Sequence, residues 1–192
     1  MTGTPASHVG FIVEDIHVAI VRFSEVLGVT FNDPVTVHLD HLYNPHHRPG
    51  TITVAYSKEG PPHYELIQGE AHGVYSMDGG GEGMHHVGVW ETDLERRMSE
   101  LADQGLTVEA RVLLDDGTLL TAFNDPNDLH GVRVEFIDDR DRTTMEAFMK
   151  TGGFAEPYDK FSFPEPGEMR LCPIEPPSRS RLSTNGGNRL LL

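Results

Sequence analysis

The chain contains an internal repeat, and this repeat limits the folds open to it more than any other feature. The segments HVGFIVEDIHVAIVRFSEVLGVTF (8–31) and HVGVWETDLERRMSELADQGLTV (86–108) align when one is shifted by 78 residues (86 − 8). Each opens with His-Val-Gly, continues through a short apolar stretch and reaches an aspartate, Asp15 or Asp93. Repeated units of this kind are expected to fold as similar modules that pack together to complete a core.

A helix is predicted after each of the two aspartates. Apolar residues recur there at helical spacing and form one stripe per helix: Ile16, Ile20, Phe23 and Leu27 in the first copy, and Leu94, Met98 and Leu101 in the second. Asp15 and Asp93 are predicted N-caps, because a carboxylate accepts the free amide hydrogens of the first turn. Gly28 and Gly105 are predicted to end the helices, since glycine readily adopts the left-handed conformation found there.

Three strand-like stretches follow each helix. They lie at about 34–42, 51–57 and 62–68 in the first copy, and at about 106–114, 118–124 and 131–138 in the second. Each copy therefore reads β-α-β-β-β, and the chain is predicted to be an α+β protein of two tandem βαβββ modules, 6–68 and 84–138. The glycine-rich segment between them, 69–83, is predicted to be a flexible linker.

The C-terminal part of the chain differs from the repeat. A short helix is predicted within 139–153, capped by Asp141 or Thr143 and stopped by Gly152 and Gly153. Residues 154–192 hold six of the thirteen prolines and are predicted to form an extended or disordered tail.

Charge and composition narrow the possible partners. Thirty Asp and Glu against fifteen Lys and Arg give a formal net charge of −15, so nucleic acids and anionic membrane surfaces are not expected partners. No apolar run is long enough to cross a bilayer, and the N-terminus shows no basic and then apolar leader. The single cysteine, Cys172, excludes an internal disulfide. Together these features predict a cytoplasmic protein.

Strand geometry predicts that four side chains converge. Side chains alternate between the two faces of a strand, so His8 and His86 point away from the face that packs on the helices. On the last strand of each copy, Glu65 and Glu135 lie between apolar residues that point the other way. His8, Glu65, His86 and Glu135 occupy equivalent positions in the repeat, and can therefore project into one concavity between the modules.

Two imidazoles and two carboxylates suit a borderline divalent ion such as Zn, Ni, Co, Mn or Fe, and a six-coordinate ion would keep positions for water or substrate. A single strand glutamate is usually solvated, and a single strand histidine is usually structural. Four such residues at repeat-equivalent positions favour a metal site, because an inward carboxylate without a cation is costly. We therefore predict one divalent metal ion as the cofactor.

The motifs HVGFIV, HHVGVW, YELIQ and FNDPNDLHGVRVEFID resemble the vicinal oxygen chelate superfamily, which includes glyoxalase I, methylmalonyl-CoA epimerase, extradiol dioxygenases and bleomycin-resistance proteins. The resemblance covers about residues 6–138. It implies paired βαβββ modules that form a cupped mixed sheet around a metal, with the ligand positions falling on His8, Glu65, His86 and Glu135. It also implies a small-molecule substrate and a homodimer, in which the tail from Phe154 is expected to take part.

Within the superfamily, GMHHVGV and DPNDLHGVRVEF are most similar to methylmalonyl-CoA epimerases. This similarity implies an isomerase in which the metal chelates two substrate oxygens and a side chain moves a proton on the adjacent carbon. Epimerases usually supply an acidic base from a loop of the first module, but the corresponding LDHLYNPHHRPG holds no glutamate. His63, Asp40 and His41 are the candidate bases, and His63 ranks first because it shares the predicted face of Glu65.

Two further residues are candidates for substrate binding. Trp90 could form an aromatic wall on the His86 face or belong to the core. Arg133 could bind a substrate carboxylate or balance the charge of the metal ligands. The remaining loop histidines, His38, His46 and His47, fit no metal-binding spacing, and we take His85 and His130 as structural.

Other functions remain open alongside the epimerase reading. A glyoxalase I-like lyase would use the same four ligands. An extradiol dioxygenase would hold Fe with two histidines and one carboxylate, so Glu65 argues against it. A metal-free protein that binds small molecules or antibiotics would not need the four ligands, and their presence disfavours it.

Overall fold

The structure, a computed structural model, describes residues 5–78 and 81–153; the predicted tail 154–192 lies outside these residues. Nine strands form one mixed sheet in the order β2-β4-β5-β1-β6-β9-β8-β7-β3. The strands are β1 Ala6–Ile12, β2 Val35–Leu39, β3 Leu42–Tyr43, β4 Gly50–Tyr56, β5 His63–Gln68, β6 Gly83–Glu91, β7 Val108–Leu113, β8 Leu119–Asn124 and β9 Val134–Asp138. The helices are α1 Ile16–Leu27, α2 Leu94–Asp103 and α3 Arg142–Thr151, with short 3-10 turns at Pro126–Leu129 and Asp139–Asp141.

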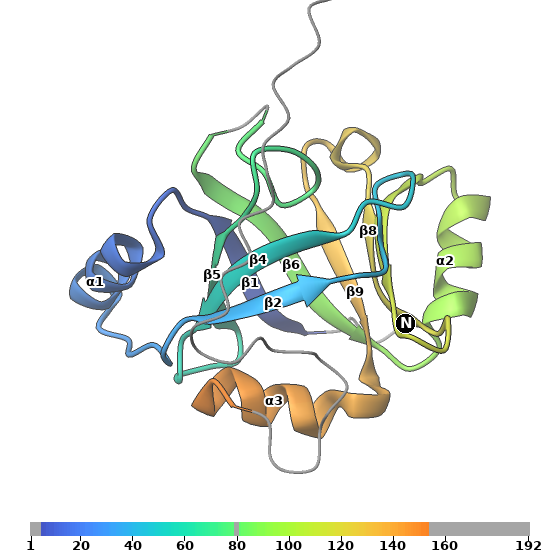
Figure 1. Ribbon diagram of the computed structural model, residues 1–192. Helices are drawn as coiled ribbons and strands as arrows, with labels where there is room; N and C mark the ends of the chain where they lie inside the picture. Colours follow the sequence, from blue (N-terminus) through green and yellow to red (C-terminus); the bar gives the residue numbers. More distant parts are fainter. Residues whose placement is uncertain (1–4, 79–80, 154–192) are drawn as a thin grey trace, which may run out of the picture.

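The sheet confirms the predicted α+β fold of two βαβββ units. The units meet at β1 and β6, which pair in antiparallel fashion. From this junction β5, β4 and β2 follow on one side, and β9, β8 and β7 on the other. Equivalent strands of the two units therefore follow in the same order away from the junction. The sheet curves into a nearly closed cup, with α1 and α2 at its two sides (Figure 1).

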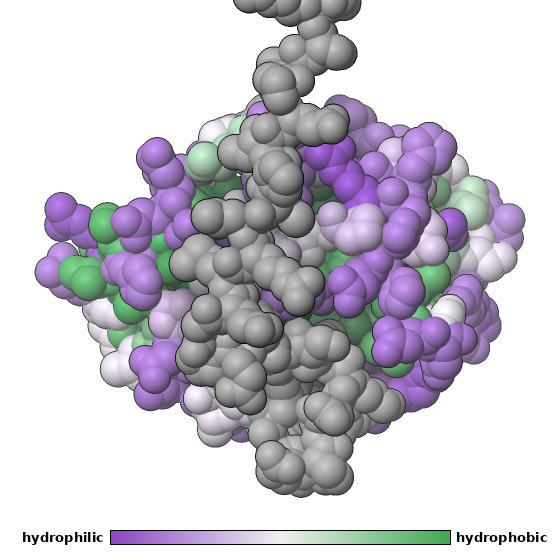
Figure 2. Space-filling model, viewed as in Figure 1, coloured by the Kyte–Doolittle hydropathy of each residue, from purple (hydrophilic) through white to green (hydrophobic). Residues whose placement is uncertain are grey.

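The first helix begins and ends as the sequence predicts. The side chain of Asp15 accepts hydrogen bonds from the amides of His17 and Val18, and Gly28 follows in the left-handed conformation with φ 69°. Although α1 is largely apolar, Val18 and Val21 remain 58% and 55% exposed. Apolar side chains are visible on the surface over this helix (Figure 2).

One strand was missed because the predicted strand 34–42 breaks into two. β2 stays in the first half and pairs with β4. After a turn at Asp40 and His41, β3 crosses to the other half, where Leu42 pairs with Val112 and Tyr43 with Arg111 of β7. This two-residue strand extends the far edge of the sheet and helps to close the cup.

The prediction of a flexible linker at 69–83 is wrong for its middle part. Val74 and Tyr75 are buried and belong to the main core. The Tyr75 ring packs edge-on against Phe123 of β8, with ring centroids 5.6 Å apart. Glycines mark the segment as irregular backbone, but its two large apolar side chains gain more from burial than from remaining in water.

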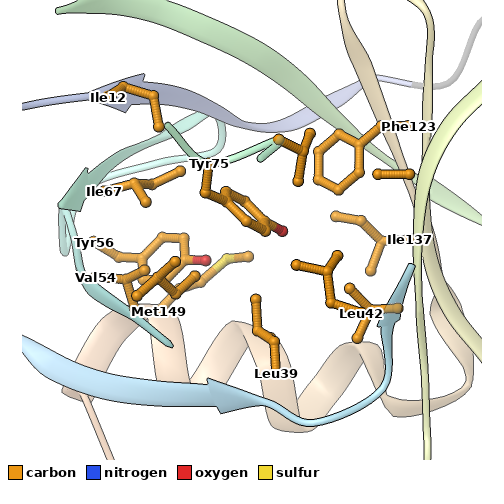
Figure 3. Close-up of a cluster of buried hydrophobic side chains, with 14 of the residues drawn as sticks. Ile12, Leu39, Leu42, Val54, Tyr56, Ile67, Tyr75, Phe123, Ile137 and Met149 are labelled. Carbon is orange, nitrogen blue, oxygen red and sulfur yellow. The ribbon is translucent and has the colours of Figure 1, made fainter. Parts of the chain in front are cut away.

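The third helix crosses the open side of the cup (Figure 1). Its residues Phe148 and Met149 are buried. The side-chain amide of Asn32 donates a hydrogen bond to the backbone carbonyl of Met149 at 3.1 Å. The main core lies between the concave face of the sheet and this helix (Figure 3). Among the described residues, none of the helices has the length and apolar character needed to cross a membrane.

Candidate metal centre

Four buried side chains meet at the centre of the cup, one from each of four adjacent strands. They are His8 of β1, Glu65 of β5, His86 of β6 and Glu135 of β9. The two histidines approach through their Nε2 atoms, which lie 2.8 Å apart. Each glutamate directs Oε2 at both histidines, at distances from 2.9 to 3.3 Å. The structure thus brings together the four residues that the repeat singles out.

The His-x-Gly motif explains how two imidazole rings fit at one point. In the β1–β6 pair, Gly10 lies opposite His86, and His8 lies opposite Gly88. A Cβ atom on Gly10 would lie 2.2 Å from the ring of His86, and one on Gly88 would lie 2.2 Å from the ring of His8. Each module's glycine therefore leaves the space that the other module's histidine occupies.

The spacing of the ligand atoms fits a divalent ion. Ligand atoms about 2.1 Å from one ion lie about 3 Å apart when they are at right angles around it. The five separations described above, from 2.8 to 3.3 Å, match this value. In addition, Oε2 of Glu65 is buried and has no hydrogen-bond partner among the described residues. A cation would satisfy this buried oxygen, which is otherwise costly.

Hydrogen bonds behind the ligands orient both imidazoles. The Nε2 atom of His85 lies 2.7 Å from the carbonyl of Val74, so it carries the proton and leaves Nδ1 as an acceptor. His86 then donates from Nδ1 to Nδ1 of His85 at 2.9 Å, so that Nε2 is the atom that faces the centre and could bind an ion in place of its proton. On the other side, Oγ of Ser7 lies 3.0 Å from Nδ1 of His8 and can accept its proton. Outer contacts of this type fix the tautomer of metal-binding histidines.

The electrostatics of the centre favour positive charge. Burial alone lowers the pKa of His86, but the charge of Glu135 and the hydrogen bond to it, with Glu65 adding to the effect, raise the pKa to about 9. Burial raises the pKa of Glu135, yet the charge of His86 and hydrogen bonds from both histidines hold it well below its usual range. By contrast, burial lowers the pKa of His85 to about 3, with His86 adding to the effect, so His85 is a neutral acceptor. The ionised carboxylate of Glu135 is thus stabilised by positive charge at the centre.

The two glutamates differ in their second oxygen. Tyr56, the residue paired with Glu65 across β4 and β5, donates its hydroxyl to Oε1 of Glu65 at 2.5 Å. The equivalent neighbour of Glu135, across β8 and β9, is Phe123, which has no hydroxyl. Within the described part of the chain, no hydrogen bond reaches Oε1 of Glu135. The site is therefore chemically asymmetric although the backbone is symmetric.

A cavity of about 90 Å³ opens onto the centre. It is lined by Glu65, Glu135, Tyr56, Tyr75 and Thr121 together with apolar side chains of the strands and of α3. The rings of Tyr56 and Tyr75 both point into the cup (Figure 3). Burial, with the charges of the two glutamates, raises the pKa of each tyrosine well above its ordinary value, so both remain protonated.

The predicted base His63 does not line this cavity. It shares the face of Glu65 along β5, as strand alternation requires, but it lines a separate pocket with Met149 and Lys150 of α3. Met145 and Phe148 of the same helix line the cavity of the metal centre instead. His63 is the register partner of His8 on the neighbouring strand, yet it lines this separate pocket and not the cavity of the four residues. The imidazole of His63 contacts the carbonyl of Ser57 at 2.7 Å.

The other four predicted site residues also lie away from the cavity. Asp40 is exposed in the turn between β2 and β3. His41 in the same turn faces Asp115, with 3.3 Å between Nε2 and Oδ1. Trp90 lines the pocket of His63, with the guanidinium of Arg142 5.7 Å from its ring centre. Arg133 forms a two-point ion pair with Glu109, at 2.7 and 3.0 Å.

The sequence interpretation missed residues that surround the ligands. Tyr75 lay in the predicted linker, and His85 was taken as structural although it orients His86. Tyr56 could have been found from the strand pairing, because it lies directly opposite Glu65 once β4 and β5 are aligned. The sequence gives no comparable signal for Tyr75, whose position depends on how an irregular segment folds back.

A cupped sheet of two βαβββ units, with two histidines and two glutamates inside, defines a protein of the vicinal oxygen chelate type. The family model of the Glyoxalase/Bleomycin resistance protein/Dioxygenase superfamily matches residues 7–119. The chain belongs to this superfamily. No curated protein matches the sequence.

Solved structures with the same fold include methylmalonyl-CoA epimerases. The Mycobacterium tuberculosis epimerase has 22% identity and a TM-score of 0.53, with coverage of 72% of this chain and 91% of the other. The Streptomyces coelicolor epimerase in complex with 2-nitronate-propionyl-CoA has 17% identity and a TM-score of 0.50, with coverage of 70% and 96%. A hypothetical protein from Bacillus halodurans has 19% identity and a TM-score of 0.55, with coverage of 71% and 95%. At these identities the likeness establishes the fold.

Proposed function

We propose that the protein is a divalent-metal-dependent enzyme that chelates a small oxygenated substrate and moves a proton beside the chelated oxygens, as an isomerase of the epimerase type. The observation that carries this proposal is the buried set of His8, Glu65, His86 and Glu135 at the base of a cavity. When bound there, a divalent ion would supply a Lewis acid for negative charge that develops on a substrate oxygen.

The proton acceptor in this proposal is Glu135. Of the described residues that line the cavity, only the two glutamates and the two tyrosines can readily exchange a proton. The tyrosines remain protonated, so they act as donors. Oε1 of Glu65 already accepts the Tyr56 hydroxyl, whereas Oε1 of Glu135 carries no hydrogen bond within the described residues. This free oxygen is available to take a proton from the substrate carbon.

The same geometry gives Tyr56 and α3 a role in this proposal. The hydroxyl of Tyr56 holds Glu65 in place, so that this glutamate serves as a ligand only. The apolar walls of the cavity and the overlying α3 exclude water, which strengthens the electrostatic interactions inside.

The proposal is tested by isotope exchange. Purified protein is loaded in turn with Zn, Ni, Co, Mn and Fe(II) and screened against acyl-CoA, hemithioacetal and hydroxyketone substrates. A substrate that turns over should take up deuterium from D₂O at the carbon next to the chelated oxygens. The proposal is contradicted if none of the metals binds. It is also contradicted if a substrate turns over without taking up deuterium although the proton-accepting group exchanges its proton with solvent.

Two variants separate Glu135 from His63 as the base. Phe123→Tyr offers Glu135 the hydroxyl that Tyr56 offers Glu65, and should lower turnover about 100-fold, the usual contribution of a general base, at unchanged metal content. Glu135→Gln should abolish turnover and weaken metal binding. His63→Ala, the control, should keep near-normal turnover, because His63 lines a separate pocket and not the cavity of the four residues.

A glyoxalase I-like lyase is the second candidate, because the same ligands and the same proton acceptor serve a hemithioacetal substrate equally well. The products distinguish the two: an isomerase inverts the configuration at the exchanging carbon, whereas the lyase yields a thioester. A binding protein without catalysis would bind ligand but show neither exchange nor turnover.

A further inference from the structure

We infer that the substrate of this site is a small, uncharged and largely apolar molecule with two adjacent oxygen atoms, and not a carboxylate or an acyl-CoA thioester. This inference rests on the proposed function and names the substrate class of the same cavity. It follows from the charge, the walls and the hydroxyls of the cavity.

The charge of the cavity leaves no place for an anion. Within the described chain, no lysine or arginine lines it. Its two carboxylates would be balanced by one divalent ion, so a further substrate carboxylate would be buried without a counter-charge, which is costly. Two nearby arginines are already committed: Arg133, two residues before Glu135, is paired with Glu109, and Arg142, three residues before Met145, with Glu146.

The walls are apolar and close together. Leu39 and Ile52 from the first half face Val112 and Leu120 from the second, and Met145 and Phe148 of α3 cover them. The volume of about 90 Å³ is far below the roughly 300–1,000 Å³ of sites that bind drug-sized ligands. Apolar walls favour an apolar substrate body, and the volume limits that body to a few carbon atoms.

Besides the two glutamates, the cavity offers hydroxyl groups. Thr121 is only 9% exposed, and its Oγ1 atom has no hydrogen-bond partner among the described residues. Tyr75, 8% exposed, also lines the cavity and is kept protonated. Buried polar groups are normally satisfied, so the unpaired hydroxyl of Thr121 indicates a partner on the substrate, and the hydroxyl of Tyr75 offers a second donor beside it. These hydroxyls can donate to carbonyl and hydroxyl oxygens of a substrate, but they carry no positive charge that would balance a carboxylate.

Two elements outside the repeated modules set these limits. α3 supplies Met145 and Phe148, and the segment before β6 supplies Tyr75. Without them the cup would be wider and more open at both places. The substrate class is therefore determined by segments that the βαβββ repeat does not contain.

The test uses full-length protein loaded with Co(II), whose visible absorption changes when a ligand enters its coordination sphere. Three probes are compared: maltol, a small hydroxypyranone that is uncharged in solution and releases its hydroxyl proton to solvent on chelation; comenic acid, which chelates in the same way but carries an additional carboxylate; and methylmalonyl-CoA. We expect maltol to change the cobalt spectrum and to bind at least ten times more tightly than either charged probe. If the protein takes up cobalt but binds comenic acid or methylmalonyl-CoA more tightly than maltol, this inference is overturned and the proposed function is not. If the protein does not take up cobalt, the proposed function itself is contradicted.

Variants of the two hydroxyl residues test recognition without activity. Thr121→Val and Tyr75→Phe keep the side-chain shape and should each weaken maltol binding about ten-fold at unchanged cobalt content. Tyr64→Phe is the matched control, because Tyr64 lies on the opposite face of β5 and does not line the cavity. Unchanged maltol affinity in both cavity variants would contradict the assignment of these hydroxyls to the substrate.

Discussion

Single glycines decide whether the metal centre can form. Gly10 and Gly88 lie opposite the histidines of the other module, and neither has a positive φ that would itself require glycine. Their role is to leave space for the imidazole rings. This spatial requirement accounts for the repeated His-x-Gly better than any backbone preference does.

Gly10→Ala and Gly88→Ala should therefore each weaken metal binding by at least ten-fold, because the new methyl group displaces the facing imidazole. Metal affinity can be measured by competition with a chromophoric chelator. Gly50→Ala is the control: Gly50 also lies in a strand, but a Cβ atom there meets its neighbours at an ordinary 3.6 Å. Equal affinity in all three variants would show that the rings do not need this space.

Strand alternation was sufficient to place the four ligands but not to delimit the cavity. His63 and Trp90 do share the faces of Glu65 and His86, as predicted from the sequence. Alternation assigns a face of the sheet, however, and not a position along it relative to a helix that crosses that face. The position of α3 depends on packing over long sequence distances, so the strand alone could not predict that His63 lines a different pocket from Glu65.

At the scale of elements, the entry into α3 is held by Asp138 at the end of β9. Its carboxylate accepts a hydrogen bond from the amide of Arg140 at 2.9 Å and pairs with the Arg140 guanidinium. Burial raises the pKa of Asp138, but the hydrogen bonds from Arg140 outweigh this effect and lower it. A carboxyl group whose pKa is lower in the folded state than in the unfolded state stabilises the fold at pH values above its unfolded-state pKa. This stabilisation is lost as the pH falls through the folded-state pKa.

Asp138→Asn should accordingly lower the free energy of unfolding near pH 7 by about 1 kcal/mol, typical for loss of a charged capping group. The difference from the wild type should shrink as the pH falls below about 4, where Asp138 takes up a proton in both states. Urea unfolding at several pH values measures this. A difference that stays constant from pH 7 to pH 3 would contradict the role of the charge.

The order of the helices and strands along the chain could be predicted from the sequence better than their packing could. The repeat and its helical stripes gave α1, α2 and three strands per module. β3 was missed because two residues form too short a pattern, and because their partner strand lies in the other half. Tyr75 was missed because burial of an irregular segment leaves no periodic signal.

For the whole molecule, metal binding should be a large part of the stability, since the four ligands come from both halves of the sheet. A chelator should lower the melting temperature, and restored metal should raise it again; a free metal concentration 100 times the dissociation constant contributes about 2.7 kcal/mol. Calorimetry with and without chelator measures this. Glu135→Gln should show a much smaller response, and an unchanged wild-type melting temperature would contradict metal binding.

The exposed apolar side chains of α1 bear on assembly. Val18, Val21 and Val26 are 55–79% exposed on one helix, and apolar surface of this kind is common where subunits meet. We therefore expect a homodimer, with this helix at the interface. Light scattering of the wild type should give twice the mass of one chain, and Val18→Lys with Val21→Lys should give monomers. Glu95→Lys on α2 is the control; a monomeric wild type would contradict the prediction.

The reciprocal fit of histidine and glycine also suggests a history. One βαβββ unit carries half of the ligand set and the space for half of another, so a chain of half this length could hold an ion only by joining a second copy of itself. Duplication and fusion of such a gene would turn an encounter between two molecules into a contact within one, at a high effective concentration. After fusion the two halves no longer need to be identical. The Tyr56 and Phe123 pair is one such difference: a hydroxyl holds one glutamate, and its counterpart in the other half has no such partner on the neighbouring strand.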